Sequence, residues 1–205
     1  MFEAFILAGG KSARLQREKA LVELNGDNLV SRAVRVVQSS GAAKTTLLAG
    51  TKGKSLSAYF PDLDVENDFS PGLGASGGLF TALKESGAEY VFVLACDLPL
   101  VTSELISFLA KRFEESEADA CVPMQPDTFK QPLCAFYRKS SCIVPFQAEI
   151  LRSELTPSVR DLLNKVNTEY VEFEDLAALK GSENFFLNIN TPLDLEAARE
   201  IVKDQ

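Results

Sequence analysis

The stretch Tyr90-Val-Phe-Val-Leu-Ala95 is apolar at every position. A strand of this kind is normally buried on both faces, at the centre of a largely parallel sheet that helices cover on both sides. Other short apolar segments have strand character, at 2–7, 45–49, 120–123, 133–137 and 170–173. Segments of helical period lie between them, at 28–38, 79–83 and 103–113. This alternation predicts an α/β fold with a mainly parallel central sheet.

The composition limits what the chain can do. Its 205 residues are 46% apolar, which is enough to close the core of one domain of ordinary size. The 21 basic and 29 acidic side chains give a net charge of −8, which repels a phosphate backbone, so no nucleic-acid partner is expected. No apolar run is long enough to span a bilayer, and the start of the chain lacks the features of a signal peptide. We expect a soluble, cytoplasmic protein without a membrane partner.

The cysteines indicate the same compartment. Histidine is absent, and the four cysteines, Cys96, Cys121, Cys134 and Cys142, form no Cys-x-x-Cys pair. The usual ligands of a zinc site and the base of a histidine triad are therefore missing. Small apolar neighbours indicate reduced cysteines in the core of a cytosolic protein.

Ligands of an open α/β sheet sit at the carboxyl ends of its strands. The first strand leads into Leu7-Ala-Gly-Gly-Lys-Ser-Ala-Arg-Leu-Gln-Arg-Glu-Lys19. Its glycines allow close approach of backbone amides to a phosphate or base, and Arg14 and Lys19 can neutralise phosphate charge. The spacing is neither a Walker A loop nor a Gly-x-Gly-x-x-Gly turn. Taken alone, the pattern also fits a βα turn with solvated cations.

Asp97 follows the most hydrophobic strand in Ala95-Cys-Asp-Leu-Pro99. A carboxylate at this edge suits Mg²⁺, which commonly uses one or two protein carboxylates together with substrate phosphates. The alternative is that Asp97 caps the next helix or forms a turn.

A third polar segment, Asn67-Asp-Phe-Ser-Pro-Gly-Leu-Gly-Ala-Ser-Gly-Gly78, is rich in glycine. Asp68 can accept hydrogen bonds from a base or a ribose. We expect Gly77 and Gly78 to open the helix 79–83 and to present free amide groups to an anion. The alternative is an ordinary flexible loop.

A fourth segment, Asn188-Ile-Asn-Thr-Pro-Leu-Asp194, follows the apolar residues 185–187. On a strand, Asn188 and Asn190 would point to the same side and face one ligand. Capping of the next helix by Thr191, with proline in the first turn, is the simpler explanation of this segment. A helix N-terminus is predicted at Ser103 for the same reason.

With these motifs in this order, the chain resembles the molybdenum cofactor guanylyltransferases of the MobA-like nucleotidyltransferase group over nearly all of its length. The N-terminal loop is similar to the family's Leu-Ala-Gly-Gly-x-Ser-x-Arg-Met-Gly-x-Asp-Lys, and the third segment to Gly-Pro-Leu-Gly-Gly. Asp97 falls on the metal-binding Asp of Cys-Asp-x-Pro. Residues 131–139 match a later strand, and residues 188–192 match Asn-Ile-Asn-Thr-Pro.

The resemblance implies a Rossmann-like three-layer nucleotidyltransferase domain over residues 1–205, with a GTP-binding N-terminal half and a molybdopterin-binding C-terminal half. The positions that it implies for the guanine nucleotide are Leu7, Ala8, Gly9, Gly10 and Asp68. A one-residue slip in the alignment would replace Asp68 by Asn67.

The same resemblance assigns the phosphates to Arg14 and Lys19 and a Mg²⁺ cofactor to Asp97. It places Asn188 and Asn190 beside molybdopterin, with Arg160 as a weaker candidate. The implied reaction joins GMP from GTP to the phosphate of molybdopterin and releases pyrophosphate. Molybdoenzyme acceptors or cofactor-biosynthesis proteins are the implied protein partners.

Three departures from the family pattern bear on activity. Gln16 stands where the family has glycine, Glu18 where it has Asp, and Ala75-Ser76 where it has Pro-Leu. A Gln side chain in a phosphate loop either turns outward or blocks the close approach that glycine permits. The expected result is slow turnover in an intact fold.

Other functions fit parts of the pattern. A cytidylyltransferase of the same cofactor and a sugar-phosphate nucleotidyltransferase share the glycine loop, although the cytidylyl branch tends to carry Asp at the positions of Asn188 and Asn190. A non-catalytic nucleotide or cofactor carrier is the alternative from another class. Lys19, Arg14 and Asp97 together argue against a carrier, which needs no phosphate and metal ligands.

Overall fold

The computed structural model describes residues 1–9, 11, 12, 17–70 and 72–203. Of the predicted site residues, Gly10 and Arg14 lie outside the described residues, as does Gln16.

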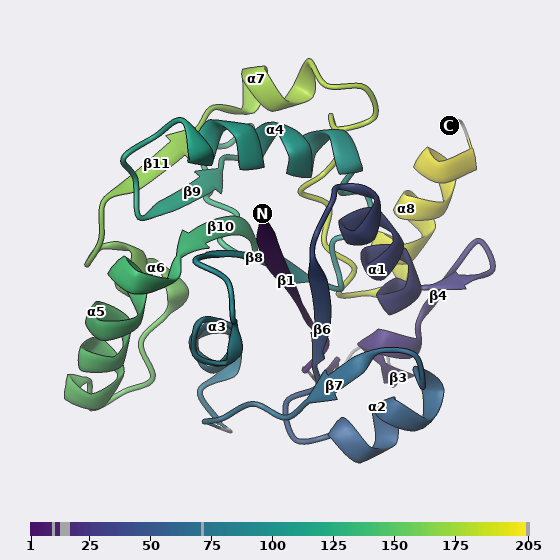
Figure 1. Cartoon of the computed structure of the whole chain (residues 1–205). Helices are drawn as coiled ribbons and strands as arrows, with labels where there is room; N and C mark the ends of the chain where they lie inside the picture. Colours follow the sequence, from purple (N-terminus) through teal and green to yellow (C-terminus); the bar gives the residue numbers. More distant parts are fainter. Residues whose placement is uncertain (10, 13–16, 71, 204–205) are drawn as a thin grey trace.

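Strands between Phe2 and Val171 form a seven-stranded sheet, in the order β11-β9-β10-β8-β1-β6-β7 (Figure 1). Their bounds are β1 Phe2–Leu7, β6 Lys44–Leu48, β7 Asp64–Glu66, β8 Tyr90–Ala95, β9 Ala120–Pro123, β10 Cys134–Arg138 and β11 Thr168–Val171. Neighbouring strands run parallel, except that β10 is antiparallel to both β8 and β9. The mainly parallel central sheet is confirmed.

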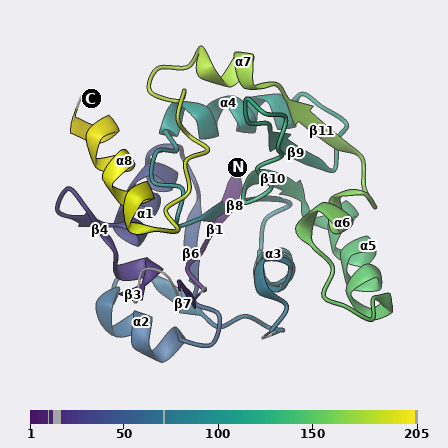
Figure 2. The same ribbon diagram turned by 180° about the vertical axis from the view of Figure 1, so that it is seen from behind.

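Helices cover both faces of the sheet, which makes three layers (Figures 1 and 2). On one face lie α1 (Leu29–Ser39) and α4 (Ser103–Glu114). On the other face lie α3 (Gly74–Glu85), α5 (Lys139–Arg152) and α6 (Val159–Leu163). The predicted Rossmann-like three-layer class is therefore confirmed.

The two faces of β8 explain its uniformly apolar sequence. Phe92 and Leu94 belong to the core on the side of α1 and α4, whereas Val91 and Val93 belong to the core on the side of α3, α5 and α6. All four side chains are fully buried. Alternate residues of a strand face opposite sides, so a strand between two helical layers needs an apolar residue at each position.

The C-terminal helix packs against residues near the N-terminus. Helix α8 (Pro192–Lys203) packs beside β4 (Glu23–Leu24) and α1, through a small apolar cluster that includes Leu24, Leu29 and Ala198. Ile189 belongs to the same cluster. This packing holds the segment before α8 against the loop after β1.

The remaining described elements are short. They are β2 Lys11–Ser12, β3 Arg17–Glu18, the 3-10 helix η1 Lys19–Leu21, β5 Asp27–Asn28, α2 Gly53–Tyr59 and α7 Phe173–Ala177. Strands β2 and β3 pair as a hairpin in the loop after β1, and β4 and β5 pair as a second one.

The strand predicted at 170–173 has other bounds, and the apolar residues 185–187 are not a strand. Strand β11 ends at Val171, because Phe173 already starts α7 and packs against Phe185 and Phe186. Residues 185–187 form turns and not a strand, since the Phe185 and Leu187 amides donate to carbonyls three residues earlier. From this turn, Phe185 packs in the core and Phe186 packs against it.

The helix predicted at 79–83 is longer than expected. Helix α3 begins at Gly74, because glycines at the next turn allow close packing that a β-carbon would prevent. A β-carbon on Gly78 would come within 3.1 Å of Leu7, and one on Gly77 within 2.9 Å of the Ser70 carbonyl oxygen. Glycine is a poor helix former, so its local preference is overridden here by tertiary packing.

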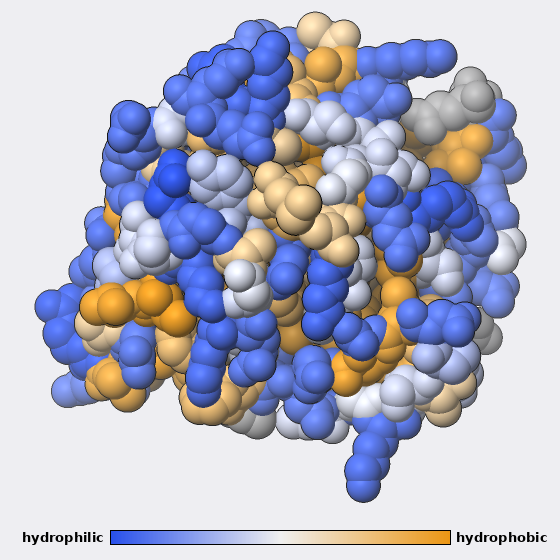
Figure 3. Space-filling model, viewed as in Figure 1, coloured by the Kyte–Doolittle hydropathy of each residue, from blue (hydrophilic) through white to orange (hydrophobic). Residues whose placement is uncertain are grey.

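The face shown in Figure 3 is mainly hydrophilic, with apolar side chains gathered over α5 at its left. Val144 and Leu151 on this helix are 67% and 78% exposed. Within the described part of the chain, no helix combines the length and the apolar character that crossing a membrane requires.

Candidate active site

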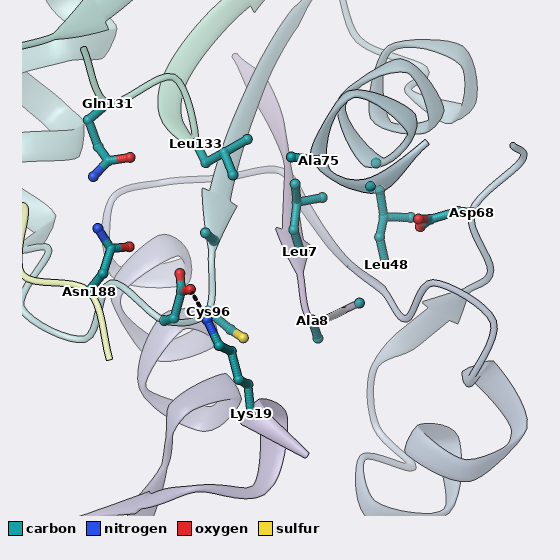
Figure 4. A pocket seen from close by; sticks show the side chains of 15 residues that line it. Leu7, Ala8, Lys19, Leu48, Asp68, Ala75, Cys96, Gln131, Leu133 and Asn188 are labelled. Carbon is teal, nitrogen blue, oxygen red and sulfur yellow. Dashed lines mark hydrogen bonds and ion pairs between the residues drawn. The ribbon is translucent and has the colours of Figure 1, made fainter. Parts of the chain in front are cut away.

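A cavity opens at the carboxyl ends of β1, β6 and β8 (Figure 4). Its lining residues are Leu7, Ala8, Gly9, Lys19, Leu48, Asp68, Gly74, Ala75, Gly78, Ala95, Cys96, Asp97, Gln131, Leu133 and Asn188. The cavity therefore brings together residues from all four polar segments that the sequence singled out. We call it the main cavity.

Lys19 connects two distant segments at one side of the main cavity. Its Nζ donates to Asp97 Oδ2 at 2.6 Å and to Asn190 Oδ1 at 2.6 Å. The side chains of Lys19 and Asp97 are only 15% and 18% exposed, so water screens this ion pair less than one at the surface. The backbone supports the contact, because the Ile189 amide donates to the Asp97 carbonyl at 2.9 Å.

One oxygen of Asp97 has no partner. Lys19 satisfies Oδ2, while Oδ1 is buried and accepts no hydrogen bond from any described residue. A buried unpaired carboxylate oxygen is costly, and each such atom in a native structure calls for an explanation. A cation or a donor from a ligand would satisfy it. No described group of three or more Asp, Glu, Cys or His side chains is arranged to hold a metal ion.

Asp68 lies at the opposite side of the main cavity, as Figure 4 shows. Its side chain is half-buried, and desolvation raises the pKa of this carboxyl, while a backbone hydrogen bond at Gly50 lowers it by less. The neighbouring Asn67 has another role, because its Oδ1 accepts from the Gly53 amide at 2.9 Å at the start of α2.

The loop after β1 lies close to the loop after β6. The Ala8 amide donates to the Leu48 carbonyl at 2.8 Å, and a β-carbon on Gly9 would lie 2.8 Å from the Gly50 amide nitrogen. Only glycine fits at position 9 without moving this backbone. Leu7, Ala8 and Gly9 line the main cavity, as their place at the strand end predicts.

Asn188 and Asn190 both reach this site, although not from a strand. Asn188 lines the main cavity, and its Nδ2 donates to the Phe186 carbonyl at 3.2 Å. The Asn190 and Thr191 amides donate to Asp194 Oδ2, and the Asp194 amide donates to Thr191 Oγ1. Thr191 therefore caps α8 as predicted, in the reciprocal pattern of a capping box.

Gly77 does not present a free amide to the cavity. Its N–H donates to the Leu73 carbonyl at 3.3 Å, since it lies inside α3 and not before it, and Gly77 is not among the lining residues. Our prediction for Gly77 as an anion-binding residue is wrong for this reason. Ser76 also faces away, because its hydroxyl donates to the Pro157 carbonyl at 2.6 Å.

Burial keeps the cysteine thiols protonated. All four are free and buried. Burial raises the pKa of the Cys96 thiol to about 12, with a further increase from the charge of Asp97. Cys96 therefore stays a protonated thiol at neutral pH, although it lines the main cavity.

A second cavity adjoins the main one. Its lining residues are Ala75, Lys130, Gln131, Pro132, Leu133, Ser158, Val159, Arg160, Asp161 and Leu163. Arg160 therefore lies beside the main cavity and not within it. Lys130 stands 4.0 Å above the ring of Tyr170, a distance at which a cation is attracted to the aromatic face.

Sequence reasoning missed Gln131, Leu133 and Lys130 as lining residues. They precede β10, and the sequence did not reveal that β10 is antiparallel to β8. In an antiparallel pair the start of one strand lies beside the end of the other. The Ala95 amide accordingly donates to the Leu133 carbonyl at 2.7 Å, which places this segment beside Asp97.

Comparison with known proteins gives a consistent result. The pattern of the MobA-like NTP transferase domain matches residues 4–169. A relative from Carboxydothermus hydrogenoformans, named probable molybdenum cofactor guanylyltransferase, is 34% identical over 96% of this chain and 94% of its own. A relative of the same name from Thermococcus kodakarensis is 31% identical over 93% of this chain and 90% of its own.

Solved structures have the same architecture. The crystal structure of molybdopterin-guanine dinucleotide biosynthesis protein A from Archaeoglobus fulgidus superimposes with a TM-score of 0.85, at 26% identity and over 100% of both chains. A nucleotidyl transferase from Methanothermobacter has a TM-score of 0.73 at 17% identity, and shares the fold.

Proposed function

Because the chain belongs to the MobA-like NTP transferase family, we propose that it transfers GMP from GTP to the phosphate of molybdopterin and releases pyrophosphate. The product is molybdopterin guanine dinucleotide. The observation that carries the proposal is the contact of Lys19, which lines the main cavity with Asp97, with both Asp97 and Asn190.

The reaction suits a site without histidine. An oxygen of the acceptor phosphate forms a bond to the α-phosphorus of GTP, and the bond from that phosphorus to the bridging oxygen breaks. Its electron pair leaves with pyrophosphate. The nucleophile is already anionic, so no general base is needed. What the protein must supply is alignment of two anions that repel each other, and positive charge near the phosphorus.

Lys19 supplies one such charge, and we assign Arg14 to the same task from the family pattern. Leu7, Ala8, Gly9 and Gly10 are assigned to the guanine nucleotide. Among these residues Gly10 and Arg14 lie outside the described part of the chain.

Asp68 is assigned to the base or ribose. Asn188 and Asn190 are assigned to the acceptor. The N-terminal half of this single domain then binds GTP, and the C-terminal half binds molybdopterin.

The chemistry of Asp97 fits a divalent metal. Its unpaired Oδ1 and the absence of a described multi-carboxylate cluster fit an ion that is held by one protein carboxylate and by substrate phosphates. Mg²⁺ bound there would neutralise phosphate charge during transfer.

The four buried thiols fit a reducing compartment, which favours the cytoplasm. Molybdoenzymes or other cofactor-biosynthesis proteins are the partners to which a dinucleotide product would pass.

Calorimetric titration with GTP, CTP, ATP and UTP in the presence of Mg²⁺ tests the base preference. GTP is expected to bind most tightly, and a clear preference for CTP would contradict the guanylyl assignment. Pyrophosphate release with molybdopterin tests turnover. Tight binding of GTP without any release of pyrophosphate would favour a nucleotide carrier over an enzyme.

A further inference from the structure

Gln131 is a buried polar residue at the junction of the two cavities. It is 7% exposed, and it lines both the main and the second cavity. The other residues that line both are Ala75 and Leu133, which are apolar. Gln131 is thus the polar side chain, among the described lining residues, that meets whatever passes from one cavity to the other.

The backbone around Gln131 is firmly held. Its amide donates to the Pro123 carbonyl at 2.9 Å, and its carbonyl accepts from the Cys134 amide at 3.1 Å. Tyr137 donates its hydroxyl to the Pro132 carbonyl at 2.6 Å. These bonds fix the point from which the Gln131 side chain extends, while the side-chain torsions are ordered only when the amide binds a ligand.

The side-chain amide of Gln131, by contrast, makes no hydrogen bond with the described part of the chain, and its atoms face the cavity (Figure 4). The amide atoms keep contact with the solvent of the cavity, so a ligand group can replace water as their partner. In Figure 4 the Gln131 side chain lies on the same side of the cavity as Asn188 and away from Asp68. A ligand group on this side is the natural partner.

We propose that Gln131 binds the acceptor phosphate and aligns it with the α-phosphorus of GTP. This inference rests on the proposed function. If the nucleotide occupies the main cavity and the acceptor reaches it through the second cavity, the acceptor's reacting end passes the junction. That end is the phosphate. Lys130 and Arg160 line the second cavity and suit the rest of an electron-rich acceptor.

The chemistry of an amide suits this position. The N–H groups of Gln131 donate to a phosphate oxygen without adding a formal charge, so the attacking oxygen keeps its electron density. A lysine there would also bind the phosphate, but it would lower the nucleophilicity of the anion that must attack. Lys19 supplies charge nearby, at Asp97. The two side chains thus divide alignment and charge neutralisation between them.

The test compares three variants of the full chain. Gln131→Leu removes the amide but nearly keeps its volume, and Gln131→Glu places a negative charge beside the phosphate. Gln147→Leu makes the same change at an exposed position on α5 that lines neither cavity, and serves as the control. Each is assayed for pyrophosphate release at varied molybdopterin and saturating GTP, and for GTP binding by calorimetry with Mg²⁺.

For Gln131→Leu we expect kcat/KM for molybdopterin to fall about 10- to 100-fold, as for loss of a hydrogen bond to a charged group, with the Kd for GTP within twofold of the wild type. Gln131→Glu should lose more than Gln131→Leu, and Gln147→Leu should lose nothing. Wild-type kcat/KM in Gln131→Leu would overturn the inference. An equal loss in GTP affinity would also overturn it, because Gln131 would then bind the nucleotide or support the fold. Failure of the wild type to release pyrophosphate would instead refute the proposed function.

Discussion

The two sides of the main cavity place a carboxylate in opposite electrostatic environments. Asp97 is paired with Lys19 at 2.6 Å, and this ion pair is tied to Asn190 in the C-terminal segment. Asp68 has no salt bridge among the described residues, and desolvation raises the pKa of its carboxyl. One side is therefore built around opposite charges, whereas the other exposes a partly dehydrated acceptor.

This difference matches the two ends of a nucleoside triphosphate. The phosphate end carries several negative charges and needs cations, which Lys19 supplies. The base end is neutral and is read by hydrogen bonds, for which a partly dehydrated carboxylate is a strong acceptor. We infer from this contrast that the two acidic residues of one cavity serve different chemistry, and each can be removed separately.

The largest effect is expected from Asp97→Asn, which breaks the charged side. The change is nearly isosteric, so the fold should persist. Loss of the charge and of a metal ligand should reduce pyrophosphate release by about 100- to 1000-fold, as removal of one preorganised charge-stabilising group typically does. Asp62→Asn, on the exposed turn before β7, is the matched control. Wild-type rates in Asp97→Asn would mean that Asp97 is structural.

The next largest effect is expected at Asp68, on the other side of the main cavity, where GTP affinity should depend on pH. Because its pKa is raised, Asp68 should take up its proton at a higher pH than an ordinary Asp. A base N–H needs the ionised form as acceptor, so GTP affinity should fall as the pH decreases through that raised pKa. Asp68→Asn should weaken GTP binding about tenfold at neutral pH and should flatten this pH dependence, as measured by calorimetry.

Stability should change in the opposite direction in that variant. A raised folded pKa means that ionised Asp68 opposes folding at neutral pH, and folding gains stability as the pH falls through that pKa. Asp68→Asn should therefore leave the Tm unchanged or slightly higher at neutral pH. Asn67→Ala is the adjacent control, because it removes the cap on Gly53 and should lower the Tm without changing base preference. Loss of GTP preference in Asn67→Ala alone would transfer the assignment from Asp68 to Asn67.

The smallest effect is expected at Gln16, which lies outside the described residues. If its side chain obstructs closure of the loop on the triphosphate, Gln16→Gly should raise GTP affinity or turnover by a few-fold. The gain must exceed a glycine entropy cost of roughly 0.5–1 kcal/mol. Gln16→Ala separates removal of the side chain from the added backbone freedom. Weaker GTP binding in both variants would show that Gln16 is an adapted contact and not an obstruction.

Much of the fold was predictable because period and burial are local properties. β8 and β1 have the predicted bounds, and α4 begins at Ser103 as expected, although the hydroxyl of Thr102 makes its cap. The start of α3 was not predictable from propensity. Its glycines are required by contacts with Leu7 and Ser70, which the local sequence does not reveal.

The candidate site was likewise predictable only in part. Glycines and polar residues at strand ends identified Gly9, Asp68 and Asp97 as cavity residues, because parallel strands bring their carboxyl ends to one edge. Asn188 lines the cavity as well, although turns and not a strand precede it. Gly77 was misassigned because the helix start was misplaced.

By itself, the sequence determined the α/β layers, the strand ends that carry the polar residues and the acidic, histidine-free chemistry of the protein. Only the tertiary structure decided that Lys19 meets Asp97, 78 positions away, and Asn190, 171 positions away. It also decided that Gln131 stands between two cavities. The physical reason is that side-chain period depends on near neighbours along the chain, whereas these contacts depend on strand direction and on how α8 packs against β4 and α1.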